Sequence, residues 1–205
     1  MLRLGRGWAD ADSILSSDPN LSRKEKYRKN AALFYQGGEI CSQSLEIFKR
    51  ISIGGFSVFG NGCGAIALYN LTLMTRGKAD LAKIILELEH NHALRLNGAL
   101  GVSSRGIEGY LNAHGFDYEV YKNTKQCREN IEKYPAAIIY IRNRRSITEH
   151  YYCVINTPDG SFSLNRFCNQ PQPSRISPNQ IRGVIKAFCI KTPLAPELSA
   201  DITTR

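Results

Sequence analysis

Residues 54–74 read GGFSVFGNGCGAIALYNLTLM, a glycine-rich approach that leads into a long apolar run. Four glycines fall within residues 54–62, which suits a loop whose backbone takes unusual dihedral angles or passes close to another segment. After Gly64 the run is apolar nearly all round, a pattern typical of a helix buried in the middle of a domain. Cys63 is therefore expected at the N-terminus of that helix.

The sequence changes from a helical to a strand-like pattern near Gly115, where apolar residues begin to alternate with polar ones. Helices are predicted over residues 21–35, 39–50, 64–74, 79–95, 104–114 and 124–134, and strands over 116–120, 136–142, 149–156, 161–167 and 183–191. Pro158-Asp159-Gly160 is a strong turn signal that joins two of these strands. The order predicts an α+β fold, a helical half followed by an antiparallel β-sheet half, with a cleft where they meet.

The chain has 205 residues, of which 42% are hydrophobic and 22% charged, as expected for one globular domain with appendages. We expect an N-terminal helical extension over residues 1–52, a main domain over 53–192 and a flexible tail over 193–205. No window approaches the roughly 18 consecutive apolar residues of a membrane span, and no secretory signal is visible. A soluble, cytoplasmic protein without membrane insertion is expected.

The charge and cysteine patterns argue against several classes of protein. The net charge is +9, but the basic residues lack the aromatic interleaving of single-strand binders, so nucleic acid is not an expected partner. A basic cluster before His150 has two interpretations, selection of acidic substrate side chains near a cleft or a solvated hairpin tip. It consists of Arg142, Arg144 and Arg145. The six cysteines contain no C-x-x-C pair and so give no metal-binding or dithiol signature. We therefore expect no metal and no cofactor, and we expect the thiols to be reduced.

Cys63 has the setting of a nucleophile. A helix N-terminus supplies partial positive charge and free N–H groups, which lower the pKa of a thiol and stabilise a developing oxyanion. The alternative is a buried structural cysteine, which explains Cys127, Cys153 and Cys189 but does not require the glycine-rich approach. Cys168 borders a proline-rich loop and is expected to be more exposed.

His150 is the histidine best placed to act as the base. It opens a predicted strand after a polar turn, whereas surface positions account for His90, His92 and His114. Asn165 follows fifteen residues later, in the strand that the Pro-Asp-Gly turn brings alongside, where its amide is expected to fix the imidazole tautomer. The alternatives for Asn165 are a fraying strand end and, as orienter, the weaker Asp159.

Three features together resemble the papain-like cysteine peptidases, in particular the bacterial double-glycine leader peptidases and their stand-alone relatives. These features are NGCGAIALYN at 61–70, the pattern G-x4-G-I-x2-Y-L-x3-G at 101–115, and the order His150, turn, strand, Asn165. The resemblance covers roughly residues 55–168 and implies a papain-like fold. It also implies a cysteine-dependent peptidase that forms a thioester on Cys63. In such a peptidase His150 transfers the proton and Asn165 orients the imidazole of His150.

One position departs from that family. Its members usually carry a glutamine six residues before the cysteine as an oxyanion donor, but Ser57 stands there. Losing such a donor costs about 2.7–4 kcal/mol of transition-state stabilisation. Asn61 is the candidate replacement, and Gln43 is an alternative from the preceding predicted helix.

Two other functions fit the same residues. A papain-like acyltransferase or deamidase uses the same Cys63, His150 and Asn165, because transfer and hydrolysis differ only in which acceptor reaches the thioester. A papain-like module with an incomplete oxyanion hole instead binds an acidic partner through its basic surface. A peptide or protein substrate is the expected partner, and the sequence gives no indication of oligomeric state.

Overall fold

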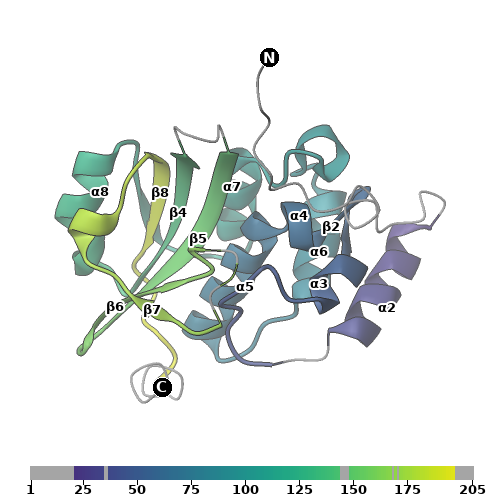
Figure 1. The fold of residues 1–205 in the computed structure, drawn as a ribbon, viewed down its shortest axis with the longest axis horizontal. Coiled ribbons are helices and arrows are strands. Elements are labelled where there is room, and N and C mark those ends of the chain that lie inside the picture. Colours follow the sequence, from purple (N-terminus) through teal and green to yellow (C-terminus); the bar gives the residue numbers. More distant parts are fainter. Residues whose placement is uncertain (1–20, 35–36, 144–147, 168, 170, 197–205) are drawn as a thin grey trace.

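The computed structural model describes residues 21–34, 37–143, 148–167, 169 and 171–196. The expectations for Arg144, Arg145 and Cys168, and those for residues 1–20 and 197–205, lie outside these residues. Most helices lie in the first half of the described chain and most strands in the second half, and the two groups lie side by side (Figure 1). The predicted mixture of helices and an antiparallel sheet is confirmed.

The helical half centres on α5, Cys63–Arg76, whose residues from Gly64 to Leu71 are all buried. Around it lie α2 (Arg23–Leu33), α3 (Ile47–Arg50), α4 (Val58–Asn61), α6 (Leu81–His90) and α7 (Ser104–Ala113). Local signals set the ends: Ser22 forms a capping box with Glu25, and Gly77 ends α5 in the left-handed conformation. The cap of α7 is Ser103, whose side chain accepts from the N–H of Gly106.

The predicted helix over residues 39–50 is wrong for most of its length, because only Ile47–Arg50 is helical. Distant side chains bind the main chain of this segment in place of helical hydrogen bonds. Asn70 donates to the carbonyl of Ile40 and accepts from its N–H, both at 2.8 Å. The N–H of Gln43 donates to Oδ1 of Asn165, also at 2.8 Å. These bonds tie the segment to the middle of α5 and to Asn165.

The sheet has six strands in the order β3-β8-β4-β5-β6-β7, and every neighbouring pair is antiparallel. Its strands are β3 Tyr118–Tyr121, β4 Ala136–Asn143, β5 Thr148–Thr157, β6 Gly160–Leu164, β7 Ser174–Arg175 and β8 Val184–Ile190. A separate small hairpin, β1 Ser52–Ile53 with β2 Phe56–Ser57, precedes α4. The predicted strand over 161–167 ends early because Asn165 takes a φ of 58°.

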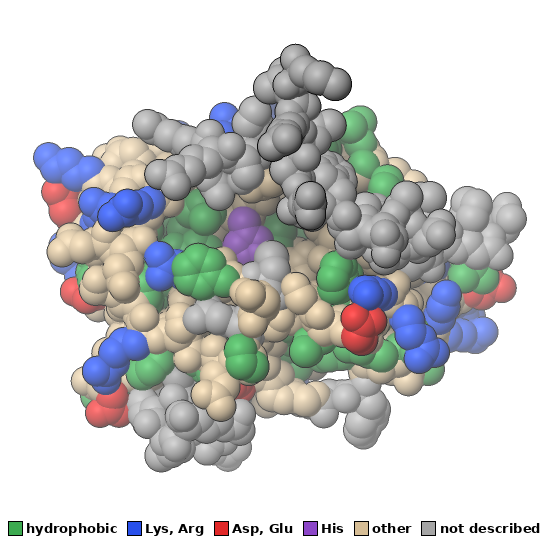
Figure 2. Space-filling view, viewed as in Figure 1, with side chains coloured by type: hydrophobic (Ala, Val, Ile, Leu, Met, Phe, Trp, Pro, Cys, Tyr) green, Lys and Arg blue, Asp and Glu red, His purple; other side chains and the backbone are tan. Residues whose placement is uncertain are grey.

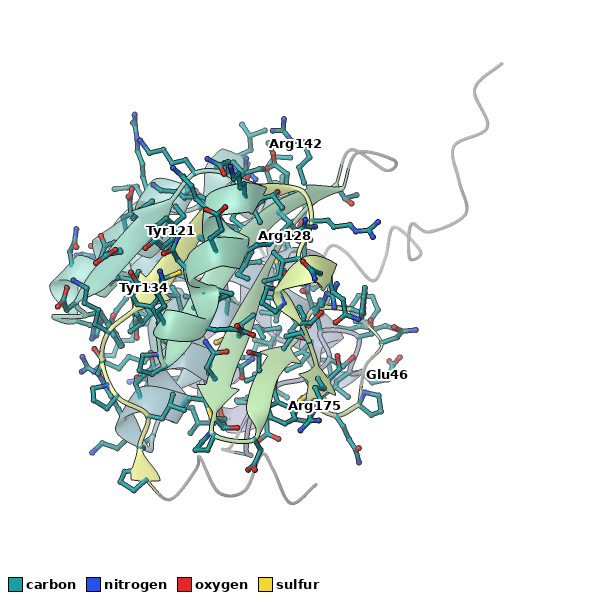
Figure 3. All side chains as sticks on the ribbon, turned by 90° about the vertical axis from the view of Figure 1, so that its left-hand side faces the viewer. Glu46, Tyr121, Arg128, Tyr134, Arg142 and Arg175 are labelled. Carbon is teal, nitrogen blue, oxygen red and sulfur yellow. The ribbon has the colours of Figure 1, made fainter. Side chains whose placement is uncertain are left out.

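Hydrophobic cores lie on both faces of the sheet. On one face α5 packs against β5 and β4, in a core that also contains Phe48 and Ile51. On the other face α8, Thr124–Asn130, and the 3-10 turn Ile131–Lys133 cover a second core, with Arg128, Tyr121 and Tyr134 around them (Figure 3). No helix in the described ranges has both the length and the apolar character needed to cross a membrane.

Candidate functional site

The start of α5 lies unusually close to its neighbours, and glycine makes this possible. A Cβ at Gly64 would lie 2.7 Å from Cβ of Val102 and 3.5 Å from Cδ2 of Tyr151. Gly54 has a φ of 60°, and a Cβ there would lie 2.0 Å from the carbonyl oxygen of Asn97. The predicted close approach of the glycine-rich segment is therefore present at Gly54, and Gly64 adds a second close approach just after that segment. It brings the first turn of α5 against β5 and against the 94–102 loop.

Cys63 opens α5 as predicted, with its side chain partly buried. Its thiol lies near the main chain of Tyr151 in β5, which favours the thiolate form. Burial raises the pKa of the thiol above 9.0, and the N–H groups of Tyr151 and Gly64, with the charge of Arg95, offset only part of that rise. This direction differs from the prediction, because desolvation of a thiolate outweighs the helix N-terminus here.

His150 lies three residues before Cys153, the first residue of β5 that pairs with β6. Its Nε2 atom is 2.5 Å from the main-chain oxygen of Asn165. A carbonyl oxygen can only accept a hydrogen bond, so Nε2 carries the proton and Nδ1 keeps a lone pair. Burial lowers the pKa of His150 below 6.5, which favours this neutral form.

Asn165 lies beside His150 as predicted, but its main chain makes the contact in place of its side-chain amide. The left-handed φ of 58° turns the carbonyl toward His150 and the side chain toward Gln43, whose N–H donates to Oδ1. Asparagine tolerates this conformation better than most residues do. Asn165 thus connects the histidine to the segment that precedes α4.

The candidate oxyanion donors differ in their availability. Gln43 is buried, and its Nε2 donates to the carbonyls of Val58 and Phe59 at 2.9 and 2.8 Å. Both of its N–H groups are therefore engaged in holding α4, and the suggested role of Gln43 as a donor is wrong for this conformation. Asn61 ends α4 two residues before Cys63 and is partly buried, so its role stays a prediction.

A charged network borders the site and was not predicted. Glu149, directly before His150, accepts from Arg95 at 2.9 Å, from Arg142 at 2.6 Å and from the hydroxyl of Tyr140. Burial alone would raise the pKa of Glu149, but these three donors outweigh it and lower the pKa to about 2. Arg95 also donates to the carbonyl of Leu100, which ties the 94–102 loop to β5.

The predicted site residues lie at the border between the two halves of the fold. Figure 2 shows a histidine side chain at the floor of a hollow there, with apolar and basic side chains around it. His90 and His92 are exposed, and His114 instead contacts Glu87 at 2.6 Å. Within the described ranges no group of three or more His, Cys, Asp or Glu is arranged to hold a metal ion.

Comparison with known proteins gives a distant likeness to solved structures. No protein-family model and no curated protein matches the chain. A solved structure that is similar is the peptidase domain of Streptococcus ComA, a bi-functional ABC transporter involved in a quorum sensing pathway. The identity is 15%, the TM-score 0.47, and the match covers 64% of this chain and 90% of that one. A likeness this distant assigns neither a fold family nor an activity, so function is argued from the geometry of the site.

Proposed function

We propose that the chain is a papain-like cysteine hydrolase that cleaves peptide bonds. Cys63 is the nucleophile, His150 transfers the proton, and Asn165 holds the imidazole through its main-chain carbonyl. The observation that carries the proposal is the contact between Nε2 of His150 and the oxygen of Asn165, because it leaves Nδ1 as the basic atom. This histidine directly precedes Tyr151 in β5, and the main chain of Tyr151 favours the thiolate form of Cys63.

The reaction follows from these roles. Sγ attacks the carbonyl carbon of the substrate while its proton passes to Nδ1 of His150, and the electron pair of the C=O bond moves to oxygen. The tetrahedral intermediate collapses to a thioester, and the leaving amine takes the proton from His150. Water, deprotonated by the same histidine, then adds to the thioester carbonyl. The C–S bond breaks, the acid product leaves, and His150 returns the proton to Sγ of Cys63. The carbonyl of Asn165 accepts from Nε2 throughout and stabilises the transient imidazolium.

The neutral resting state of the pair also fits this role. Burial raises the pKa of Cys63 and lowers that of His150, so both groups rest uncharged. His150 is then already a free base at neutral pH and needs no prior deprotonation. The resemblance of this order of motifs, Cys-Gly before an apolar helix and then a histidine strand followed by Asn165, to that of papain-like peptidases is what favours a peptide over another acyl group.

The test is covalent capture of the acyl-enzyme, with Cys63→Ala and His150→Ala as controls. The wild-type protein is treated with p-nitrophenyl acetate, nitrophenolate release is followed, and the acetylated residue is located by peptide mass mapping. We expect acetyl transfer to Cys63, none in Cys63→Ala, and a loss of at least about 100-fold in His150→Ala, the range of general-base catalysis. A peptide library then tests cleavage.

A non-enzymatic binding module is the second candidate, favoured by the raised pKa of Cys63 and by the engaged amide of Gln43. In that case Cys63 of the folded protein reacts no faster than a free thiol, and His150→Ala changes nothing. This outcome would refute the hydrolase proposal. Added amine that appears in the product would instead indicate an acyltransferase.

A further inference from the structure

Gln43 joins two segments that lie on either side of the candidate site. Its main-chain N–H donates to Oδ1 of Asn165 at 2.8 Å. Its side-chain Nε2 donates to the carbonyls of Val58 and Phe59, the first two residues of α4, at 2.9 and 2.8 Å. Asn165 directly follows β6 and accepts from His150, and α4 leads into α5. One residue therefore connects α4 to the partner of the histidine.

The side chain of Gln43 determines where its own main-chain N–H points. Residues 39–46 contain no helix or strand, so no regular secondary structure holds that N–H in place. The two hydrogen bonds from Nε2 to α4 supply this support. Asn165 in turn has a φ of 58°, a conformation that a residue with a Cβ keeps only where surrounding contacts hold it. The bond from Gln43 is such a contact.

Stability alone does not account for these two amides. Gln43 is 2% exposed and Asn165 is 1% exposed. Within the described ranges, Oε1 of Gln43 and Nδ2 of Asn165 have no hydrogen-bond partner. Burying an unpaired polar atom costs free energy, and each amide carries that cost. The bonds that these amides do make therefore point to a role in the geometry of the site.

We propose that Gln43 is a positioning residue for His150, an inference that rests on the proposed function. Its side chain, anchored on α4, holds its main-chain N–H against Oδ1 of Asn165. This bond keeps the carbonyl of Asn165 turned toward Nε2 of His150, so that Nδ1 stays the basic atom that takes the proton of Cys63. Gln43 performs no step of the reaction itself and acts through Asn165.

The experiment compares Gln43→Met with the matched control Asn70→Leu. Methionine has a similar length but no N–H donor, so Gln43→Met removes two bonds that anchor residues 39–46. Asn70→Leu also removes two bonds from a buried amide to this segment, but these go to Ile40 and not to α4. We expect Gln43→Met to slow acetylation of Cys63 by p-nitrophenyl acetate by about tenfold, a part of the general-base contribution. Asn70→Leu should lose similar thermal stability and acetylate near the wild-type rate.

Two further measurements separate positioning from a loss of stability. In the Asn165→Gly background the bond to Gln43 is already absent, so Gln43→Met should change the acetylation rate by less than about twofold. A long-range ¹H–¹⁵N spectrum reports the imidazole tautomer directly. Wild-type His150 should carry its proton on Nε2, and Gln43→Met should show a mixture of both tautomers. If Gln43→Met does not fold, Gln43→Asn, whose amide is too short to reach both carbonyls, takes its place with the same expected results.

Three results would overturn the inference alone. The first is acetylation of the Gln43 variant at the wild-type rate with the tautomer unchanged. The second is an equal loss in Asn70→Leu, which means that any loosening of residues 39–46 has the same effect. The third is a full additional loss in the Asn165→Gly background, which means that Gln43 does not act through Asn165. Failure of the proposed function looks different, because the wild-type protein itself would then acetylate slowly and without dependence on His150.

Discussion

Nε2 of His150 donates to the main-chain oxygen of Asn165 at 2.5 Å, while the side chain of Asn165 accepts from the N–H of Gln43 at 2.8 Å. One residue therefore holds the histidine with its backbone and the segment before α4 with its side chain. Both contacts depend on the left-handed φ of 58° at this position. We therefore expect residue 165 to hold His150 through its backbone conformation more than through its side-chain amide.

Asn165→Gly and Asn165→Ala separate these roles. Both remove the bond to Gln43, but glycine adopts a positive φ readily and alanine does so at a cost of about 1–2 kcal/mol. We expect Asn165→Gly to keep the carbonyl near His150 and to retain acetylation of Cys63 within about tenfold, while Asn165→Ala is less stable and less active. The rates of Cys63 acetylation and the free energies of unfolding of the two variants measure these differences. Equal inactivity of two stably folded variants would instead indicate that the side-chain amide orients the imidazole.

The pH dependence of acetylation follows from the two pKa shifts. Because the pKa of His150 is lowered from 6.5, its base form persists to a pH below that value, and the acid limb should lie below 6.5. Because the pKa of Cys63 is raised from 9.0, direct alkylation should keep rising with pH to above 9.0. Stopped-flow rates over pH 5–10 check both limbs. A thiol that titrates well below 8.5 would contradict the dominance of burial and favour a resting thiolate–imidazolium pair.

The sequence was sufficient to place Cys63 and to bring His150 near Asn165. Local signals account for this: an apolar run after Gly64 forms α5, and the turn at Pro158-Asp159-Gly160 pairs β5 with β6. These elements depend on hydrophobic periodicity and turn chemistry, which a single sequence contains. The roles of Cys63, His150 and Asn165 in catalysis remain proposals.

The parts that could not be predicted depend on contacts between distant residues. The predicted helix at 39–50 competes with hydrogen bonds from Asn70 and Asn165, which lie 30 and 122 residues away from their partners. The contact of Arg95 with Glu149 spans 54 residues, and the segment LRLNG at 94–98 gives no signal for it. The direction of the pKa shift at Cys63 depends on burial by both halves of the fold, which no local pattern reports.

Arg95 and Arg142 both bind Glu149, but only Arg95 is among the main groups that act on the Cys63 thiol. Removing the charge in Arg95→Gln should raise the pKa of Cys63 further, because the cation favours the thiolate. Alkylation at pH 8 should then be slower than in the wild-type protein. Arg142→Gln is the matched control, because it removes a similar contact with Glu149 from a side chain that is 58% exposed, and it should leave the rate unchanged. An equal effect of the two variants would mean that Glu149, through its position next to His150, controls the site and that the charge of Arg95 does not.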